Sequence, residues 1–448
     1  MFKYLLLLIL FIPSFAYSAT CGGVSPCSCG DTLTSNHTMS YDLVCSTGIS
    51  GITLSGVDHI ALNCNGHSIT GPGWRTGNND AYGIYIRDNN GTPTTASTVS
   101  NCTVSGFKVG IRERASSIVA AGPGTGNIIS SNVVTANGDS VAHSFYGIEL
   151  SNASSYTIIS GNTVTNNADE GIHVGTGADI SAILANTIRD NFRENLYILD
   201  ADSIQIIGNT IGSTSSSIST NALYIKNASY WTITDNIFQR KRVHITGSSV
   251  GNIFANNSYT SSAGLLIDYY ADPTLGNLTP FGNTFTNEII TGNGSGTCIA
   301  VSGAQDTIFT NPTLTSCGSP NITIDDGGGV VNSNVQFVGY NPVSTSIGAG
   351  GTISVGWTLG FHIQNGSAVA VPGARVIVKD SANATLLDST TDASGNIASS
   401  SMLVTRGNAR VSRNPLTVNV MASGYRNNNT QVTLTANTTS TISLTALP

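Results

Sequence analysis

Short segments in which apolar and polar residues alternate recur along most of the chain. In Gly171-Ile172-His173-Val174 the apolar residues flank a polar histidine, and similar segments occupy residues 147–150, 196–198, 223–225 and 243–245. Alternation with a period of two over three to five residues, between turns rich in Gly, Asn and Ser, predicts short β-strands. The pattern therefore predicts an all-β protein.

A second pattern repeats in step with these strands. Residues 160–164 read Ser-Gly-Asn-Thr-Val, and related pentapeptides occupy residues 184–188, 207–211, 234–238 and 281–285. A short repeat of this kind cannot bury its own apolar face, whereas stacked copies bury a continuous core. Equivalent asparagines would lie ~4.8 Å apart and hydrogen-bond along the stack. The aligned positions are Asn101, Asn132, Asn162, Asn186, Asn209, Asn236, Asn256, Asn283, Asn311 and Asn334. We predict a parallel β-solenoid.

Other architectures fit the sequence less well. A β-propeller needs regular blades of ~40 residues, longer than this repeat. Only 10% of the 448 residues are charged, and the abundant Gly, Asn, Ser and Thr are poor helix formers. The net charge of −7 argues against a protein that binds nucleic acid by bulk charge.

The repeats also resemble those of a known superfamily. The Gly-Asn-Thr-Ile repeat and the segment Ile60-Ala-Leu-Asn-Cys-Asn-Gly-His-Ser-Ile-Thr-Gly71 are similar to the right-handed parallel β-helix, pectate-lyase-like superfamily over roughly residues 45–340. That superfamily includes the periplasmic protein that serves nitrous-oxide reductase. The resemblance implies a right-handed parallel β-helix. It leaves the activity open, because this architecture hosts lyases, hydrolases, epimerases and non-enzymes.

The composition changes after Asn341-Pro342. The asparagine repeat ends, a Gly-rich stretch follows, and longer alternating segments appear at residues 374–378, 416–420 and 441–444. These segments predict a small β-sandwich, and the order of their turns resembles the carboxypeptidase-regulatory-like, transthyretin-like domain. We expect a β-helix over residues 19–342, a linker over 343–352 and the sandwich over 353–448.

Both the N-terminus and the cysteines indicate export. Residues 1–18 have a lysine, a short apolar run and small residues before a cleavage site, which is the pattern of a signal peptide. No later stretch has the ~20 apolar residues of a membrane span. We expect a secreted, periplasmic or cell-surface monomer. Eight cysteines in such a chain predict disulfides. We expect Cys298 to pair with Cys317, whereas the other six allow 15 connectivities.

The strand alignment predicts a strip of polar side chains on one sheet. If Ile172 and Val174 point inward, His173 points outward. The outward row that contains His173 is Tyr85, Arg112, Glu149, His173, Tyr197, Tyr224 and His244. The row before it is Tyr82, Val109, Tyr146, Glu170, Glu194, Asn221 and Lys241, and the row after it is Arg87, Arg114, Ser151, Gly175, Leu199, Lys226 and Thr246. Charged residues gathered in this way in a charge-poor chain indicate a site.

The side chains of the strip suit an acidic polysaccharide. We expect tyrosines to stack on sugar rings and basic residues to pair with uronate carboxylates, which gives Tyr85, Arg87, Arg112, Tyr146, Tyr224 and Lys226 as substrate-binding residues. The expected catalytic residues are Glu149, His173, Tyr197 and His244, with His173 and Tyr197 as the acid and base of a lyase or epimerase. Glu149 with Glu170, or Glu170 with Glu194, could instead serve as the two carboxylates of a hydrolase. Glu170 and Glu194 could hold Ca²⁺, the one cofactor that the sequence suggests.

Two classes of function remain open at this point. The first is a polysaccharide-active enzyme, most simply a lyase. The second is a non-catalytic β-helix, such as an adhesin, a carbohydrate-binding protein or a structural spacer. The chain has neither the Asp-Pro-His-Asp signature of alginate epimerases nor a clear aspartate set like that of polygalacturonases. A strip that only keeps the sheet soluble would show similar pairs of opposite charges.

Overall fold

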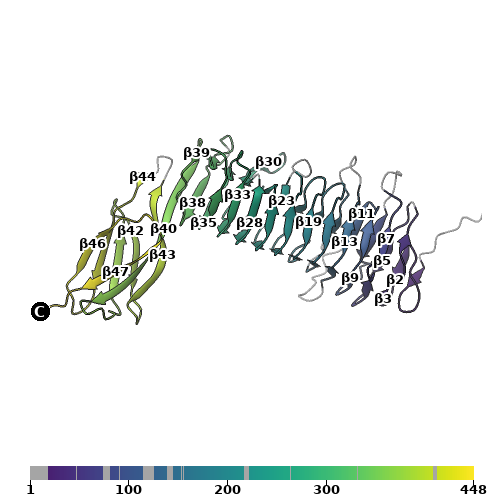
Figure 1. Ribbon diagram of the computed structural model, residues 1–448, viewed down its shortest axis with the longest axis horizontal. Helices are drawn as coiled ribbons and strands as arrows, with labels where there is room; N and C mark the ends of the chain where they lie inside the picture. Colours follow the sequence, from purple (N-terminus) through teal and green to yellow (C-terminus); the bar gives the residue numbers. More distant parts are fainter. Residues whose placement is uncertain are drawn as a thin grey trace, which may run out of the picture.

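The computed structural model is an elongated stack of β-strand coils that leads into a smaller β-structure at the C-terminal end (Figure 1). It describes residues 19–46, 48–73, 81–89, 91–114, 126–138, 145–152, 154, 156–215, 221–262, 264–329, 331–406 and 411–448. The predicted signal peptide, residues 1–18, lies outside these ranges. Within them the regular elements are all β-strands, and none of the described residues belongs to an apolar helix that could cross a membrane.

Three long sheets form the walls of the stack, and most coils contribute one strand to each wall. The first sheet runs in the order β1 (Thr20–Cys21), β2 (Asp31–Leu33), β5 (Ile52–Ser55), β8 (Tyr82–Arg87), β11 (Val109–Arg114), β14 (Ile148–Ser151), β17 (Ile172–Val174), β20 (Leu196–Leu199), β23 (Asn221–Lys226), β26 (Arg242–Thr246), β29 (Leu265–Asp268), β34 (Ile299–Ser302), β37 (Ile322–Asp325) and β39 (Thr345–Ile347).

The second sheet runs in the order β4 (Leu43–Val44), β7 (Ser68–Thr70), β10 (Thr103–Ser105), β13 (Val133–Thr135), β16 (Thr163–Thr165), β19 (Thr187–Arg189), β22 (Thr210–Gly212), β25 (Ile237–Gln239), β28 (Ser258–Ser262), β33 (Ile289–Gly292) and β36 (Thr313–Thr315).

The third sheet begins with β3 (His37–Thr38), β6 (Ala61–Asn63), β9 (Thr98–Ser100), β12 (Ile128–Ser130), β15 (Ile158–Ser160), β18 (Ala182–Leu184), β21 (Gln205–Ile207), β24 (Thr232–Thr234), β27 (Ile253–Ala255), β32 (Thr284–Thr286), β35 (Thr307–Thr310) and β38 (Asn334–Val338). Neighbouring strands within these three walls pair in parallel. The all-β parallel β-helix predicted from the sequence is therefore confirmed.

The core of the solenoid is built from the inward residues of all three sheets. On the first sheet Ile172, Val174, Leu196 and Ile198 have no exposed surface, as the alternation predicts. Burial of each such side chain stabilises the fold by about 1.5–3 kcal/mol. In the third sheet the rings of four phenylalanines stack from coil to coil, with centroids 4.6–5.1 Å apart: Phe254, Phe285, Phe309 and Phe337.

A ladder of buried asparagines holds one corner of the coils at a fixed spacing. Side-chain Nδ2 donates to Oδ1 of the next coil at 3.0 Å along the series Asn132, Asn162, Asn186, Asn209, Asn236 and Asn257. Asn257 then donates to Oε1 of the fully buried Glu288 at 3.2 Å.

The ladder corrects five positions of the sequence alignment. Its members are Asn257 rather than Asn256, and Glu288 rather than Asn283. Asn311 stands opposite Asn287 rather than Glu288, and Asn334 lies in β38 of the third sheet. Asn283 instead accepts from Asn252 in a separate pair at the corner before the third sheet. The corners before the second and the third sheet both use asparagine in this way, so the pentapeptide does not reveal which corner a given repeat occupies. Asn101 is also one residue out, because the backbone N–H of the next residue, Cys102, donates to Oδ1 of Asn132.

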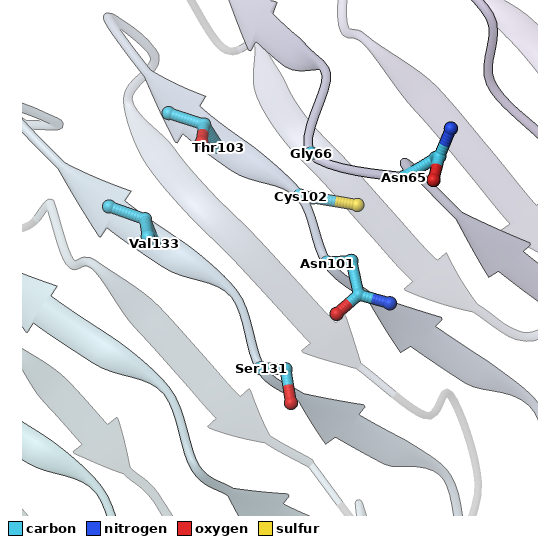
Figure 2. Close-up of a pocket in the computed structure, with 7 residues that line it drawn as sticks. All are labelled: Asn65, Gly66, Asn101, Cys102, Thr103, Ser131 and Val133. Carbon is cyan, nitrogen blue, oxygen red and sulfur yellow. The ribbon is translucent and has the colours of Figure 1, made fainter.

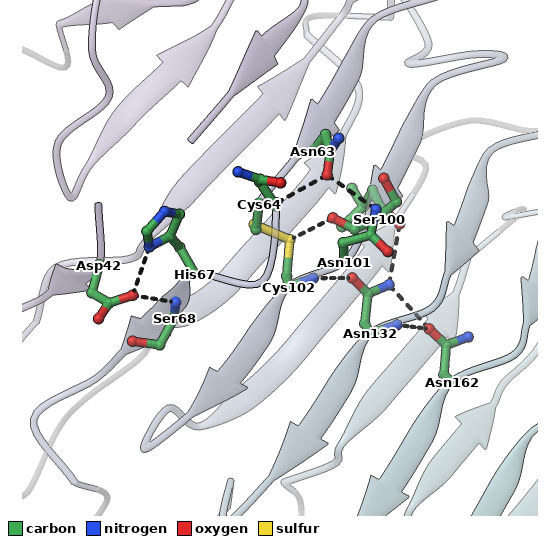
Figure 3. The surroundings of a disulfide bond; sticks show 12 residues. Asp42, Asn63, Cys64, His67, Ser68, Ser100, Asn101, Cys102, Asn132 and Asn162 are labelled. Carbon is green, nitrogen blue, oxygen red and sulfur yellow. Dashed lines mark hydrogen bonds and ion pairs between the residues drawn. A yellow bond between two sulfur atoms is a disulfide. The ribbon is translucent and has the colours of Figure 1, made fainter. Parts of the chain in front are cut away.

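Four disulfides join the eight cysteines. The bonds are Cys21–Cys27, Cys29–Cys45, Cys64–Cys102 and Cys298–Cys317, and the last confirms the predicted pair. Figure 3 shows the Cys64–Cys102 bond at the start of the asparagine ladder, next to Asn132 and Asn162. The covalent bond and the ladder therefore fix the same corner of successive coils.

The C-terminal part shares one strand with the solenoid. β40 (Thr352–Asn365) pairs in parallel with β38 near its start, and farther along with β43 (Asn396–Arg406) and β47 (Thr438–Leu444). β44 (Val411–Ser412) extends this sheet. A separate antiparallel sheet has the order β42 (Thr385–Thr390), β41 (Arg375–Lys379), β45 (Leu416–Met421) and β46 (Asn428–Val432). Buried residues of both sheets, including Phe361 and Val418, form a second hydrophobic cluster.

The predicted boundary at residues 343–352 contains β39 and the first residue of β40. Ile353 of β40 belongs to the core of the solenoid, and Leu359 of the same strand belongs to the second cluster. The division into separate folding units, and the resemblance of the C-terminal part to a carboxypeptidase-regulatory-like domain, stay predictions.

Candidate functional site

The outward row predicted on the first sheet lies in register. Glu149 is the strand partner of His173, and His173 is the partner of Tyr197. The same row continues to Tyr224 and His244 in the next two coils. In the row before it, the partner of Asn221 is Arg242 and not Lys241. A bulge between Asn221 and Leu223 shifts the register there, which the alternation alone does not reveal.

Five rings of this face form a continuous stack, which we call the aromatic strip: Tyr146, His173, Tyr197, Tyr224 and His244. The Tyr146 and His173 rings are nearly parallel with centroids 4.3 Å apart. His173 and Tyr197 are 5.2 Å apart at 53°, and Tyr197 and Tyr224 are 5.2 Å apart at 17°. Tyr224 meets the edge of His244 at 4.7 Å. The strip is a rigid, apolar surface along the helix axis.

A buried carboxylate orients His173. Nδ1 of its imidazole lies 3.2 Å from Oε2 of Glu170, whose residue is only 3% exposed. Nε2 lies on the side of Gly175, where a Cβ atom would stand 3.3 Å away. The third outward row therefore leaves an open position beside Nε2, because glycine has no side chain there.

Arg193 holds three carboxylates next to His173. Its Nη1 lies 3.5 Å from Asp169 and 3.5 Å from Glu170, and its Nε lies 3.7 Å from Glu194. Asn221 also donates to Glu194 at 3.2 Å. The sequence pattern alone did not single out Arg193 or Asp169 as site residues. A signal was present, because the dipeptides Asp169-Glu170 and Arg193-Glu194 are 24 residues apart and so occupy the same corner of consecutive coils.

Toward the N-terminal end of the strip, Arg112 is held by two neighbours. It makes a bidentate ion pair with Glu149 at 3.0 and 3.1 Å and donates from Nη1 to the hydroxyl of Tyr82 at 2.5 Å. Tyr85 packs against Tyr82 with centroids 4.7 Å apart, and the guanidinium of Arg87 lies 5.6 Å from the Tyr85 ring. Basic and aromatic groups thus alternate over the first coils of this face.

At the C-terminal end of the aromatic strip, His244 contacts an aspartate that was not part of the predicted outward rows. Its Nε2 lies 2.8 Å from Oδ1 of Asp268, on the next strand of the sheet. The rows predicted from the sequence stopped at His244, although Asp268 directly follows the strand segment 265–267. Lys226 points to the hairpin β30 (Tyr270–Asp272)–β31 (Gly276–Leu278), where its Nζ lies 3.5 Å from the centre of the Tyr270 ring.

Burial changes the acidity of the tyrosines in the strip. Desolvation, and then the negative charges of nearby carboxylates, raise the pKa of Tyr146 well above its usual value. Desolvation, with Tyr224, Glu170 and Glu194, does the same for the pKa of Tyr197. Burial and Asp268 raise the pKa of Tyr224 to about 12. These phenols stay protonated at neutral pH and can act as hydrogen-bond or proton donors.

The three glutamates beside the aromatic strip lie in the predicted outward rows, but they are not open to solvent. Glu149, Glu170 and Glu194 are at most 7% exposed, and each faces an arginine. For the expected Ca²⁺ ligands Glu170 and Glu194, Arg193 supplies the positive charge between the two carboxylates. Among the residues that the structure describes, no three His, Cys, Asp or Glu side chains form a metal-binding group.

A separate shallow pocket lies at the corner between the third and the second sheet, in the first coils of the stack. Its volume is about 330 Å³, and Figure 2 shows its lining: Asn65, Gly66, Asn101, Cys102, Thr103, Ser131 and Val133. The sulfur of Cys102 is held in a disulfide, and the remaining lining residues carry no acid or base. The aromatic strip, not this pocket, therefore provides the groups that could perform chemistry.

Comparison with known protein families gives one match. The family model described as periplasmic copper-binding protein (NosD) matches residues 36–218 and 139–268, which together span more than half of the chain. None of the curated protein sequences matches the chain.

Several solved structures are similar in part. The catalytic unit of a thermostable GH87 α-1,3-glucanase from Streptomyces thermodiastaticus strain HF3-3 is 14% identical, with a TM-score of 0.43 over 72% of this chain and 63% of that chain. The pre-mature gene product 12 of bacteriophage phi29 is 13% identical, with a TM-score of 0.43 over 72% and 52%. The A-module of the Azotobacter vinelandii mannuronan C-5 epimerase AlgE4 is 12% identical, with a TM-score of 0.32 over 73% and 87%. The chain spans less than two thirds of the length of the glucanase unit and of the phage protein.

Proposed function

The chain belongs to the NosD family, and we propose that it is a polysaccharide lyase that cleaves an acidic polysaccharide along the aromatic strip. Its four disulfides and its membership of a periplasmic family both indicate an extracytoplasmic location. A polymer substrate suits such a place and an elongated, open binding face.

The observation that carries the proposal is the setting of His173. Because Glu170 faces Nδ1 at 3.2 Å, the tautomer with the proton on Nδ1 is favoured, and Nε2 keeps its lone pair. The space over Gly175 gives a sugar access to that nitrogen. This is the arrangement that a general base requires, with one nitrogen oriented and the other free for substrate.

Tyr197 can supply the matching acid. Its ring lies 5.2 Å from that of His173, and its phenol carries a proton at neutral pH. In the proposed elimination, Nε2 of His173 takes the proton on the carbon next to the uronate carboxylate. The electron pair forms the new carbon–carbon double bond as the bond to the glycosidic oxygen breaks, and Tyr197 protonates that oxygen. Tyr146 and Tyr224 offer flanking faces for the neighbouring sugars, with Arg87 and Arg112 as the nearest positive charges toward the N-terminal end.

The proposal does not use copper, although the family description names it. All eight cysteines are bridged, so no thiolate is available as a ligand. His173 and His244 each face a carboxylate rather than each other. With no cluster of three ligands among the described side chains, the residues do not fit a copper site, and no step runs through the metal.

One observation favours a second candidate, a non-catalytic carbohydrate-binding solenoid. Glu149, Glu170 and Glu194 each pair with an arginine, as expected for ion pairs that stabilise the surface of a sheet. Such a protein would bind the polymer on the same rings without converting it.

A substrate screen separates the two candidates. The purified protein is incubated with polyuronates and with neutral polysaccharides, and both ultraviolet absorbance from new double bonds and new reducing ends are measured. Lyase action gives both signals on a polyuronate, and His173→Ala removes both. Reducing ends without absorbance would overturn the elimination in favour of hydrolysis. Binding without either product would favour the non-catalytic candidate.

A further inference from the structure

A row of residues at the corner before the third sheet has a left-handed backbone conformation. Tyr156, Ile180, Ser203 and Tyr230 occupy equivalent positions in four consecutive coils, two residues before strands that pair in register. Their φ angles are 63, 54, 60 and 62°. Glycine or asparagine normally supplies this left-handed conformation, and a bulky residue there is an outlier. The same conformation recurs at another corner of the stack, for example at Ser131, Ala185 and Asp235, so this row differs in the size of its side chains rather than in its backbone.

Two of these positions present large apolar side chains to solvent. Tyr230 is 66% exposed and Ile180 is 50% exposed. Phe281, 44% exposed, lies two coils beyond Tyr230, since the N–H of Gly251 donates to its carbonyl. With Tyr156 these residues form what we call the corner ridge. Coils are ~4.8 Å apart, so neighbouring members of the ridge are separated by one or two coil spacings along the stack. Phe281 stands one residue before the row of Tyr230, because it pairs with Val250.

The next coil supports the ring of Tyr230. A Cβ atom on Gly251 would lie 3.2 Å from both Cδ1 and Cε1 of that ring, so the glycine leaves the space that the ring uses. The ring therefore rests against the backbone of the following coil while most of the residue stays in water. That is a supported platform rather than a loose surface side chain.

The polar groups beside the ridge are acidic. Oδ1 of Asp179 accepts the backbone N–H of Asp202 at 2.7 Å, and Oδ1 of Asp202 accepts that of Ser229 at 2.7 Å. These carboxylates directly precede ridge positions in the chain. They are suited to accept hydrogen bonds from sugar hydroxyls, and they repel a polyanion. An acidic polymer of the kind proposed for the aromatic strip is thus disfavoured here.

We infer that the corner ridge is a second carbohydrate-binding surface, which takes a neutral polysaccharide lying along the helix axis. The aromatic rings supply apolar faces for the C–H faces of the sugar rings. The aspartates supply hydrogen-bond acceptors. Regular coil spacing gives the repeated contacts that a polymer of identical units can use together. The ridge is distinct from the aromatic strip, which lies on the first sheet, so the two surfaces can hold different polymers.

Affinity electrophoresis of the full chain in gels with hydroxyethyl cellulose, a neutral glucan, tests this inference. We expect the glucan to retard the protein, and Tyr230→Asn to weaken the apparent affinity at least tenfold. Asparagine tolerates the left-handed conformation, so this variant removes the ring without adding strain. Tyr230→Phe keeps the ring and should bind like the parent. Ser203→Asn, at the equivalent position of the preceding coil, is the matched control and should leave retardation unchanged.

Other outcomes would overturn the inference. Equal retardation of the parent and Tyr230→Asn would show that the ridge does not bind the glucan, as would the absence of any retardation. Loss of retardation in His173→Ala with Tyr230→Asn unaffected would move the binding to the aromatic strip. Sedimentation that finds a dimer in the parent and a monomer in Tyr230→Asn would identify a second copy of the chain as the occupant.

Discussion

Oε2 of Glu170 lies 3.2 Å from Nδ1 of His173, three residues along the same coil. The carboxylate is buried and the imidazole is partly open, so a carboxylate inside the wall of the solenoid orients a ring at its surface. Arg193 contacts the same carboxylate from the next coil. The pair therefore depends on how two coils stack and not only on the local strand.

Replacement of His173 by alanine should abolish lyase turnover without unfolding the protein. A general base contributes about 10²–10⁴-fold to the rate, and an outward side chain contributes little to the core. Initial rates from ultraviolet absorbance, together with thermal unfolding, check this. His67→Ala, which removes another histidine paired with a carboxylate, Asp42, should keep full activity. A His173→Ala enzyme with near-parent rates would remove His173 from the mechanism.

The variant Tyr197→Phe should lose catalysis but keep binding. The phenylalanine retains the ring that stacks on Tyr224 at 5.2 Å, but it has no proton to give to the leaving oxygen. We expect kcat to fall about 10²–10⁴-fold while KM changes little. Steady-state kinetics on the substrate found in the screen give both values. A rise in KM with an unchanged kcat would instead assign Tyr197 to binding alone.

Two inward carboxyls should make the protein more stable in mild acid than at neutral pH. Burial raises the pKa of Glu113 to about 7 and that of Glu288 to about 7, from the usual 4.5. The native state then holds these protons more tightly than the unfolded state does. Their stabilising effect is complete below pH 4.5 and is lost as the pH rises to 7, by about 3 kcal/mol for each carboxyl.

Denaturant unfolding at pH 4.5 and pH 7.5 measures this loss. Glu288→Gln keeps an oxygen that can accept from Asn257, so it should reduce the pH dependence and raise the stability at pH 7.5. Glu113→Gln should act in the same direction, because Asn127 and Thr157 already donate to its carboxyl. A variant that shows the same difference between the two pH values as the parent would contradict the assignment.

Limited proteolysis should cut first within residues 341–352. Val343 is 84% exposed, and glycines stand at both ends of the turn between β39 and β40. Because β40 carries core residues of both parts, we expect the two fragments to stay associated after cleavage. Mass spectrometry identifies the site, and gel filtration tests the association. Earlier cleavage inside the described coils would contradict a boundary here.

Alternation alone was enough to predict the faces of the strands. An inward Ile172 and Val174 require an outward His173, and the repeat places Tyr197 next to it in the following coil. The structure agrees because strand geometry has a period of two and stacked coils keep one register. The bulge between Asn221 and Leu223 broke that register only for Lys241. The extra residue pairs Asn221 with Arg242, whereas Tyr224 and Lys226 keep their predicted partners.

The sequence by itself determined that the chain is a stack of short strands, which side chains point outward, and that Cys298 has Cys317 one coil away. Only the tertiary structure decided that Glu149, Glu170 and Glu194 are buried in ion pairs, that Arg193 joins two coils, and which residues continue the asparagine ladder. The reason is physical. Alternation along a strand is a local property, whereas contacts between coils depend on turn lengths that vary from repeat to repeat and on the competition between neighbours for each charge.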